Sequence, residues 1–410
     1  MSEKTLLVFQ TAYPYSEMVS RDLTDFFTSK DLSGYFTRVI TINGFGNILK
    51  SSELNFKVRE IQHNKTHTFI EATNSKFFFM LKFPAINFIL SQFYLFKAIS
   101  KIVLENKIDI IRAEDPRYNG ILGCYFSWRL QTPLVVGCWG NPDTIRKLTG
   151  KPMAPRLFRR IAVEKLIEKY VFSKANLAIA QNVDNLNYIK QFRFPNLKLA
   201  IFRLGNAINP IHFTEPANRE LVSFRNKYGI EASTRIVICV SALEKRKIIE
   251  DAIHAFRIVI ENTKCHLILV GAGSMEFDYR KLVSDLGISQ SVTFTGIINQ
   301  LELSSYLAQS DVVLSPLTGR ALTEAMLAST PVVAYKIDCH PDFINSGVNG
   351  YLVEYRDVEA MAARALELLE DANLSKKLGA AGRALILDMM NPTKLVEDQR
   401  KLFDELMRMS

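Results

Sequence analysis

Three consecutive basic residues, Lys245, Arg246 and Lys247, follow a short apolar run at 236–240. Cations held in a preorganised loop stabilise the negative charge that develops on a departing diphosphate, and they do so without a metal ion. Three cations directly after a buried strand make this loop a candidate for binding an anion. A solvated basic loop is the alternative interpretation, because exposed cations are common and contribute little on their own.

A second candidate segment begins where another apolar run ends at Ser315. A short loop carries Gly319, and a helix is expected to begin near Arg320. Glycine lets the backbone approach a ligand closely, and the N–H groups at a helix start attract an anion such as a diphosphate. Glu324 lies one turn into this helix, and its carboxylate can accept hydrogen bonds from two hydroxyl groups, as a ribose offers. A helical glutamate is ordinarily solvated, so surface exposure is the alternative for Glu324.

Short apolar runs alternate with helical segments along the chain, which is the pattern of open parallel sheets covered by helices on both faces. The strands expected in the amino-terminal half are Thr5–Gln10, Thr37–Ile42, Ile108–Arg112, Leu134–Cys138 and Leu177–Ala180, with a helix over about Glu17–Ser29. Those expected in the carboxy-terminal half are Ile236–Val240, His266–Val270, Ser291–Phe294, Asp311–Ser315 and Pro331–Tyr335, with a helix over 248–260. The chain is thus expected to form two doubly wound halves that meet near Asn206–Glu220, followed by a final helix after Pro392. Ligands of such folds bind at the carboxyl ends of the strands.

The composition favours anionic partners. The 410 residues include 51 basic and 42 acidic side chains, and the net charge of +9 suits phosphates, nucleotides or acidic lipid head groups. No dense arginine block, zinc-finger spacing or aromatic RNA-binding motif is present, which argues against nucleic acid. The histidines show no metal-ligand spacing, and the N-terminus lacks the pattern of a signal peptide. Buried free thiols in a reducing, cytoplasmic compartment are expected for the scattered cysteines Cys124, Cys138, Cys239, Cys265 and Cys339.

Two segments bear on membrane contact. Phe77–Phe96 is apolar and aromatic, but polar residues such as Lys82 and Asn87 interrupt it. A core helix, an interfacial patch at an anionic membrane surface and a spanning helix are its three interpretations. The second segment, 146–174, is rich in basic residues. Glu164 falls four residues after Arg160 and Glu168 three after Lys165, a spacing that favours a solvated helix face.

Taken together, the carboxy-terminal motifs resemble the donor-binding signature of family 4 glycosyltransferases. The resemblance covers Glu324–Ala328, Pro331–Ala334, and Gly347 with Asn349 and Gly350. Val240–Lys247 is similar to the G-R-L-x-x-x-K-G loop of this family, with Lys247 at its diphosphate-binding lysine. Weaker similarities to its L-V-G-x-G turn and V-x-F-x-G run are Leu269–Gly273 and Val292–Gly296.

Three positions depart from the family pattern. Pro316 stands where the family has the first of two glutamates, which is thought to contact the donor sugar. Ala242 stands where it has a diphosphate-binding arginine, and Lys245 or Arg246 can supply that charge from the same loop. Asp342 replaces a further glutamate. The departure at Pro316 affects the contacts with the sugar and leaves the nucleotide side of the signature intact.

The resemblance implies the α/β GT-B fold, in which two Rossmann-like, doubly wound domains face a central cleft and a C-terminal helix crosses back to the first domain. It implies an acceptor-binding domain at 1–210, completed by helix 393–410, and a donor-binding domain at 211–392. The implied reaction is a retaining, metal-independent transfer of a hexosyl group from a nucleotide-sugar substrate, without a cofactor. The implied acceptor is a glycan or lipid-linked glycan, as in polysaccharide biosynthesis at the inner face of a membrane, with peripheral membrane contact.

Within this frame, Lys247 is expected to stabilise the leaving phosphate and Glu324 to hold the ribose, so these two are the catalytic candidates. The other expected donor-binding residues are Lys245, Arg246, Ile297, Pro316, Leu317, Thr318, Gly319 and Arg320. The acceptor or base candidates follow strands of the amino-terminal half, although solvated loop positions are the alternative for each of them. They are Glu114, Asp115, Trp139 and Asp143.

Two other functions stay open at this point. The first is a non-catalytic relative that binds a nucleotide or a partner enzyme, which the departures at Ala242 and Pro316 motivate. The second is a different enzyme built on two Rossmann halves, such as a sugar-nucleotide epimerase or a phosphorylase. Neither the acid–base cluster of the former nor the cofactor lysine motif of the latter is visible, but fold analogy alone does not exclude them.

Overall fold

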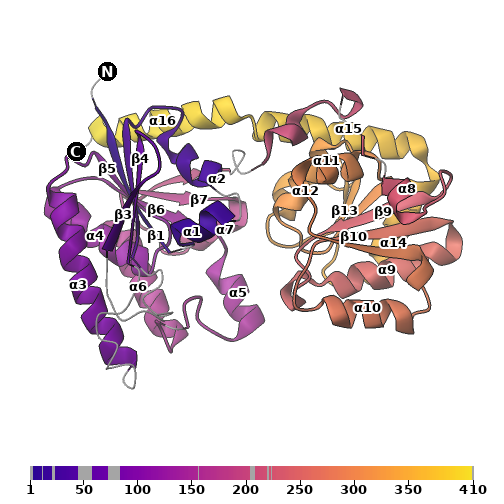
Figure 1. The fold of residues 1–410 in the computed structure, drawn as a ribbon, viewed down its shortest axis with the longest axis horizontal. Coiled ribbons are helices and arrows are strands. Elements are labelled where there is room, and N and C mark those ends of the chain that lie inside the picture. The colour runs from indigo at the N-terminus through magenta and orange to yellow at the C-terminus, as the bar shows by residue number, and fades with distance from the viewer. Residues whose placement is uncertain are drawn as a thin grey trace. The chain divides into compact units, whose positions relative to one another are not determined.

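The chain forms two compact units, Met1–Leu204 with Pro392–Ser410, and Gly205–Asn391, each built around its own sheet (Figure 1). These bounds lie close to the predicted ranges. The computed structural model describes residues 3–11, 13–20, 24–44, 58–72, 84–155, 157–203, 208–218, 221–222 and 224–408. The expected junction near Asn206–Glu220 and the apolar stretch from Phe77 therefore lie partly outside the described residues.

Unit 1 contains an eight-stranded sheet with the order β3-β4-β2-β1-β5-β6-β7-β8. All neighbouring strands are parallel except β3 and β4, which are antiparallel. Strand order changes direction between β1 and β5, which makes their carboxyl ends the topological switch point of the unit. The strands are β1 (Thr5–Gln10), β2 (Arg38–Asn43), β3 (Val58–Gln62), β4 (His67–Ala72), β5 (Ile110–Ala113), β6 (Leu134–Cys138), β7 (Leu177–Ala180) and β8 (Lys198–Ile201).

Alternate residues of β1 face opposite sides of this sheet, as the two-residue period of a strand requires. Leu7 and Phe9 pack on the side covered by α3, α4, α6 and α7, whereas Leu6 and Val8 pack on the side covered by α16. The helices of unit 1 are α1 (Tyr15–Ser20), α2 (Thr24–Thr28), α3 (Pro84–Leu104), α4 (Tyr118–Leu130), α5 (Pro142–Thr149), α6 (Ile161–Lys174), α7 (Val183–Lys190) and α16 (Pro392–Arg408).

The C-terminal helix α16 belongs to unit 1, although the preceding helix belongs to unit 2. Its side chain Phe403 is fully buried against Phe36 and Phe202. One turn of the helix is fixed by Asp404, which pairs with Lys4 at 2.9 Å. The predicted crossing of the final helix back to the first domain is therefore confirmed.

Unit 2 contains a six-stranded sheet with the order β11-β10-β9-β12-β13-β14, and every neighbouring pair is parallel. The strands are β9 (Arg235–Val240), β10 (Cys265–Val270), β11 (Val292–Gly296), β12 (Val312–Ser315), β13 (Val332–Tyr335) and β14 (Tyr351–Val353). The helices are α8 (Phe224–Tyr228), α9 (Ile249–Asn262), α10 (Glu276–Asp285), α11 (Gln300–Ala308), α12 (Arg320–Leu327), α13 (His340–Phe343), α14 (Val358–Glu370) and α15 (Ala372–Met389). Helices α9 and α14 cover one face of the sheet, and α12 and α15 cover the other.

The strands predicted from apolar runs are confirmed with ends shifted by no more than two residues. The helix expected over Glu17–Ser29 is instead represented by α1 and α2 within the described residues. Strands β3, β4, β8 and β14 were not predicted. Polar residues interrupt the apolar pattern of β3 and β4, whereas β8 and β14 are only four and three residues long. All five cysteines are buried and free, as expected. Among the described residues, no helix combines the length and the apolar character needed to cross a bilayer.

Candidate active site

The loop after β9 ends in a 3₁₀ turn that carries the three predicted cations, Lys245–Lys247. The side chains of Lys245 and Arg246 are exposed. Arg246 Nε lies 2.7 Å from Glu244 Oε2, so its charge is partly balanced within the loop. An exposed ion pair of this kind contributes little to stability. Both side chains are therefore free to rearrange around a ligand.

Lys247 differs from its two neighbours because its side chain is half-buried. Burial lowers the pKa of Lys247, the charge of Arg246 lowers it further, and the nearby carboxylate of Asp338 opposes both. A buried cation is destabilised by the loss of water and is stabilised again when an anion binds beside it. Lys247 is thus the residue of the loop best suited to hold a phosphate.

Two glycines in the turn after β10 allow the backbone to pack against the cationic loop. A Cβ atom on Gly271 would lie 1.9 Å from the carbonyl oxygen of Ser241, and one on Gly273 would lie 2.3 Å from that of Leu243. Backbone hydrogen bonds of 2.9–3.0 Å join the two segments. The glycine turn, in which the sequence showed a weak similarity to the L-V-G-x-G turn of the family, therefore positions the loop that carries Lys247.

The loop between β12 and α12 reaches the helix through Gly319, whose φ of 68° and ψ of −122° are rarely accessible to residues with a side chain. Pro316 and Thr318 are buried, and Leu317 is half-buried. Thr318 Oγ1 is hydrogen-bonded to Ser315 Oγ, which closes the loop on itself. Among the described residues no side chain caps the start of α12. Its first N–H groups are consequently suited to an anion.

Glu324 is buried, with an exposed fraction of 3%, so the solvated alternative for this residue is wrong. Its Oε1 lies 3.1 Å from Nε of Arg320, which is half-exposed. The same oxygen accepts no hydrogen bond from the residues that the structure describes. A buried carboxylate oxygen left in this state is uncommon in folded proteins. A ribose hydroxyl donating to Glu324 would satisfy it.

Ile297 follows the edge strand β11 directly and is 85% exposed. It is preceded by Gly296, which has a positive φ of 70°. A large apolar side chain with this exposure offers a flat surface to a planar ligand such as a nucleobase. The exposure of Ile297 is compatible with its predicted place among the donor-binding residues.

The sheet order brings these segments to one edge. In the sheet, β10 and then β11 lie on one side of β9. On its other side lie β12, β13 and β14, so the direction of strand order reverses between β9 and β12. Ligands of open α/β sheets bind beside the carboxyl ends of the strands at such a switch point. The loops with Lys247 and with Gly319 leave these two neighbouring strands. They are therefore brought together by topology.

Unit 1 has a separate cavity of about 170 Å³ at the carboxyl ends of β5 and β6. Three of the four predicted acceptor or base candidates line it, while Asp143 is absent from its walls. The lining residues are Glu114, Asp115, Pro116, Arg117, Gly137, Cys138, Trp139, Gly140, Ile145 and Met153.

Glu114 is held in this cavity by three neighbours. Its carboxylate lies 2.9 Å from Lys30 Nζ and 3.1 Å from Arg112 Nε, and it accepts a 2.7 Å hydrogen bond from Trp139 Nε1. Burial alone would raise the pKa of Glu114, but the charges of Arg112 and Lys30 outweigh it and lower the pKa to about 2. Such a carboxylate stays ionised and is a poor proton acceptor near neutral pH. Glu114 therefore orders the cavity wall rather than acting as a base.

Asp115 caps the next turn of the chain. Its Oδ1 accepts a 2.8 Å hydrogen bond from the backbone N–H of Arg117, and Oδ2 accepts one from the Asn119 amide. Its ion-pair partner among the described residues is Arg117, whose Nε lies 3.9 Å from Asp115 Oδ1. Of the two cavity carboxylates, Asp115 is the better placed to accept a hydrogen bond from a substrate hydroxyl.

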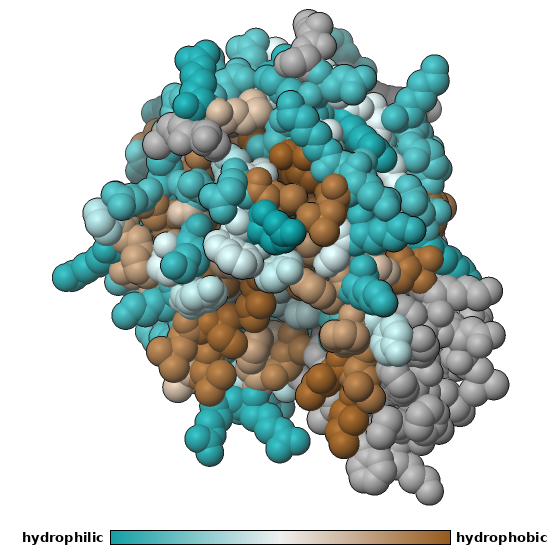
Figure 2. All heavy atoms as spheres, turned by 90° about the vertical axis from the view of Figure 1, so that its left-hand side faces the viewer, coloured by the Kyte–Doolittle hydropathy of each residue, from teal (hydrophilic) through white to brown (hydrophobic). Residues whose placement is uncertain are grey.

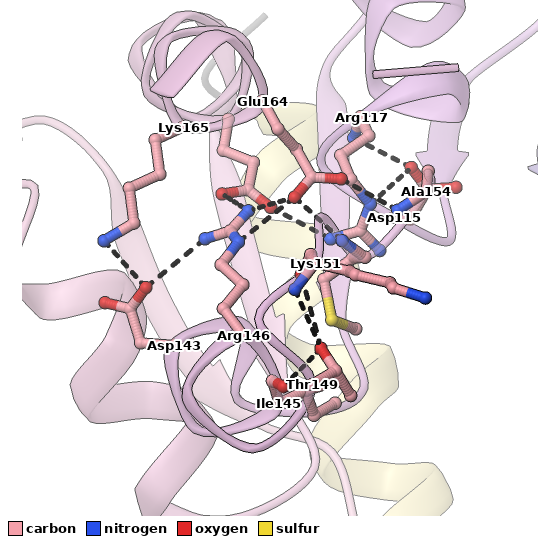
Figure 3. Close-up of polar contacts among 12 residues, drawn as sticks. Asp115, Arg117, Asp143, Ile145, Arg146, Thr149, Lys151, Ala154, Glu164 and Lys165 are labelled. Carbon is pink, nitrogen blue, oxygen red and sulfur yellow. Dashed lines mark hydrogen bonds and ion pairs between the residues drawn. The ribbon is translucent and has the colours of Figure 1, made fainter. Parts of the chain in front are cut away.

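The basic segment 146–174 is a solvated helix face only in part: Lys169 and Lys174 of α6 are exposed, but the two glutamates expected beside them are not. Glu164 and Glu168 are fully buried, and both lie within 2.8 Å of Arg146 Nη2, at 2.6 and 2.8 Å respectively. Figure 3 shows Arg146 between Glu164 on one side and Asp143 on the other. Helical spacing predicted Arg160 as the partner of Glu164. The glutamate instead pairs with Arg146, which belongs to a different helix, α5. Arg156 of this segment lies outside the described residues.

This buried network reaches the cavity through Arg117, whose Nη1 lies 2.9 Å from Glu168 Oε1. At its other end, Asp143 pairs with Lys165 at 2.7 Å and with Arg146 at 3.4 Å. Burial raises the pKa of Asp143, but hydrogen bonds from Lys165 and Arg146 outweigh it and lower the pKa. Sequence reasoning missed Arg117, although its place two residues after Asp115 was a signal. Asp143 joins the site only through the network.

Residues 223–385 match the sequence model of the family described as glycosyl transferases group 1. The carboxy-terminal unit is a group 1 glycosyl transferase domain. This match confirms the family resemblance drawn from the motifs. The cationic loop, the glycine turn and the Gly319–Glu324 segment all lie inside the matched range.

Two curated proteins of bacteria are similar to this chain over part of its length. N-acetyl-alpha-D-glucosaminyl L-malate synthase of Bacillus anthracis is 29% identical over 194 residues, which cover 46% of this chain and 50% of the relative. A GDP-mannose-dependent monoacylated alpha-(1-6)-phosphatidylinositol monomannoside mannosyltransferase of Corynebacterium glutamicum is 28% identical over 224 residues, covering 50% and 58%. The chain thus spans about half the length of the curated relatives it matches.

Solved structures extend the likeness of fold to the whole chain. Sucrose-phosphate synthase from Thermosynechococcus elongatus superposes with a TM-score of 0.72 and 17% identity over 100% of both chains. The Anabaena protein HepE, in complex with UDP, superposes with a TM-score of 0.69 and 19% sequence identity over 98% of this chain and 100% of that chain. The GT-B architecture of two Rossmann-like domains with a returning C-terminal helix is confirmed.

Two of the departures from the family pattern have different structural settings in the group 1 domain. Ala242 is exposed in the cationic loop. Pro316 is buried directly after β12. Near Ala242, Lys245 or Arg246 can supply the positive charge of the missing arginine. The apolar ring of Pro316 cannot replace a carboxylate.

A pH-dependent contribution to stability is expected from His340, which is fully buried at the start of α13 with Nδ1 2.8 Å from the carbonyl oxygen of Tyr335. Burial lowers the pKa of His340 to about 4, and the charge of Lys247 acts in the same direction. The unfolded chain takes up this proton near pH 6.5, before the folded chain does, so acidification favours unfolding. Between pH 7 and pH 5 the free energy of unfolding is expected to fall by about 2 kcal/mol because of His340.

Urea unfolding of the wild type and His340→Phe at both pH values measures this contribution. The free energy of unfolding should differ less between pH 7 and pH 5 in the variant than in the wild type, because a phenylalanine takes up no proton. Equal differences in the two proteins would show that His340 does not carry it.

Proposed function

We propose that the protein is a glycosyltransferase that moves a sugar from a nucleoside diphosphate sugar to a glycan or lipid-linked glycan, with retention and without a metal. The observation that carries this proposal is that a half-buried cation follows β9, while a helix start without a side-chain cap and a buried carboxylate follow the neighbouring strand β12, at the switch point of the sheet. Such an arrangement suits a diphosphate with a ribose beside it.

In the proposed reaction, the bond between the anomeric carbon and the diphosphate oxygen breaks, and negative charge collects on the leaving phosphate. Lys247 and the first N–H groups of α12 stabilise this charge in place before the reaction begins. An acceptor hydroxyl attacks from the face that the phosphate leaves, and its proton passes to a phosphate oxygen. Glu324 holds the ribose and Ile297 contacts the base.

We assign the acceptor to the cavity of unit 1, where Asp115 would accept a hydrogen bond from a hydroxyl group. Cavity walls with one such carboxylate and the indole of Trp139 suit a sugar ring, which has polar edges and apolar faces. The names of similar proteins support this substrate class: the Corynebacterium relative is named for GDP-mannose and a phosphatidylinositol mannoside, and HepE was crystallised with UDP-glucose. Work at the cytoplasmic face of a membrane is part of the proposal.

Glu324→Ala is expected to lower kcat/KM for the donor by about 10–100-fold, because it removes the charged acceptor of a hydrogen bond that a ribose hydroxyl donates. A panel of UDP-, GDP- and ADP-sugars, assayed by nucleotide release, first identifies the donor. The matched control is Glu359→Ala, at an exposed glutamate of α14, which should turn over like the wild type. A Glu324→Ala enzyme with the donor kcat/KM of the wild type would remove Glu324 from the site.

A second candidate function is a non-catalytic protein that binds nucleotides, and the observations that favour it are the exposed Ala242 and the buried Pro316. Both functions predict stabilisation of the fold by a nucleoside diphosphate. Only the enzyme releases nucleotide from a nucleotide sugar in the presence of an acceptor. Stabilisation by a nucleotide sugar with no release across the donor and acceptor panels would favour the binding protein.

A further inference from the structure

Three helices of unit 1 carry apolar side chains on the side that faces away from the sheet. In α4 and α6 these residues recur every three or four positions, so each helix presents a single outward stripe. We call these residues, with their counterparts on α3, the three-helix face. Its members, with their exposed fractions, are Ile86 46%, Ile89 65%, Phe93 65% and Leu104 51% on α3, Ile121 42%, Tyr125 39% and Trp128 69% on α4, and Val163 45%, Leu166 67% and Tyr170 53% on α6.

The three helices lie side by side on one face of the sheet. Phe96 of α3 packs against Tyr125 of α4, with 4.8 Å between ring centroids. A Cβ atom on Gly120 of α4 would lie 2.6 Å from Val171 of α6, so these two helices are in close contact. Figure 2 looks onto the side of the protein where α3 lies, and brown apolar side chains reach the surface there in several places. An exposed apolar surface of this extent marks an interaction site.

The charges of the three-helix face are all of one sign. The sequences of α3, α4 and α6 contain only two acidic residues, Glu164 and Glu168, and both are fully buried in the network with Arg146. The exposed ionisable side chains of these helices are Lys97, Lys101, Arg129, Lys169 and Lys174. The burial of both glutamates therefore leaves no exposed acidic side chain on the described part of these three helices, although the exposed Glu105 directly follows α3. The surface combines apolar stripes with an excess of positive charge.

We propose that the three-helix face docks on the surface of an anionic lipid bilayer. Aromatic and aliphatic side chains enter the interface between head groups and acyl chains, while lysine and arginine pair with the lipid phosphates. A second copy of this chain is a poorer occupant, because a two-fold contact would bring the five basic side chains of each copy into the same interface, where they repel one another. The segment Phe77–Phe96 indicated such a patch from sequence, but the stripes of α4 and α6 became visible only from the helix packing.

Flotation of the full-length protein with vesicles tests this assignment. One set of vesicles contains phosphatidylcholine with about 30 mol% phosphatidylglycerol, and the other contains phosphatidylcholine alone. The anionic vesicles should bind the protein more tightly, and added salt should weaken this binding. The variant Trp128→Ser with Leu166→Ser should lower the partition coefficient about tenfold or more, and Lys169→Glu with Lys174→Glu should do likewise. Both pairs are exposed, so the fold should be retained.

Matched controls lie in unit 2. Phe277→Ser, at a side chain with an exposed fraction of 78%, and Lys376→Glu with Lys377→Glu, at exposed lysines of α15, should leave vesicle binding unchanged. Equal binding of wild type and face variants, or loss of a wild-type dimer in the Trp128→Ser, Leu166→Ser variant without any vesicle binding, would overturn the proposal. Stabilisation by nucleoside diphosphates, measured on the same variants, should be unaffected, so failure here is distinct from failure of the proposed reaction.

Discussion

Lys247→Ala is expected to lower the rate of sugar transfer by about 10²–10³-fold, the usual effect of removing one preorganised donor from a site of developing charge. The reason lies in the half-buried position of this side chain, since its pKa is lowered first by burial and then by Arg246. A cation with little water around it interacts with a phosphate more strongly than an exposed one. The effect should appear in kcat as well as in kcat/KM, because the leaving phosphate carries more charge in the transition state.

The control for this prediction is Lys376→Ala, at an exposed lysine of α15 outside the cationic loop. It should retain wild-type kcat, and circular dichroism should show that both variants are folded. Lys247→Arg keeps the charge and should recover part of the rate. If Lys247→Ala kept the turnover of the wild type, the assignment of the diphosphate to the loop after β9 would be wrong.

Glu168→Ala is expected to destabilise unit 1 by about 3–5 kcal/mol, because it leaves buried positive charge without its partner. Glu168 is fully buried and contacts Arg146 Nη2 at 2.8 Å and Arg117 Nη1 at 2.9 Å. Both arginines lose a charged hydrogen bond in the variant. Arg117 also lines the acceptor cavity, so the variant should raise KM for the acceptor more than KM for the donor.

Denaturant unfolding, followed by a probe in unit 1, measures this loss. Glu105→Ala, at an exposed glutamate next to α3, is the matched control and should change stability by less than about 0.5 kcal/mol. A Glu168→Ala protein as stable as the control would show that the network does not hold α5, α6 and the cavity loop together.

The amino-acid sequence predicted the parts of the fold that depend on local pattern. The strands β1, β6 and β7 were placed at their observed ends, because short apolar runs between helical segments are typical of parallel strands buried on both faces. The donor loops were found for a related reason. Their glycines, cations and helix start are close in sequence, so the spacing itself carries the chemistry.

The charged network was misread because its partners are distant in sequence. Helical spacing pairs Glu164 with Arg160, and only the packing of α5 against α6 shows that Glu164 pairs with Arg146 instead. The same difficulty affected Glu114, for which sequence could not show that Lys30, from a turn far earlier in the chain, holds its carboxylate. Interactions between separate elements depend on the tertiary fold and leave no local pattern.

The central claim, a diphosphate held at the switch point of unit 2, is tested most directly by the thermal unfolding of the full-length protein with UDP, GDP and ADP. One of the three should raise the melting temperature of the wild type, since saturation at about 100 times Kd stabilises a fold by about 2.7 kcal/mol. The same nucleotide should give a much smaller rise with Lys247→Ala and with Glu324→Ala, and an unchanged rise with Lys376→Ala. A rise of equal size in all four proteins, or none in the wild type with any nucleotide, would contradict the claim.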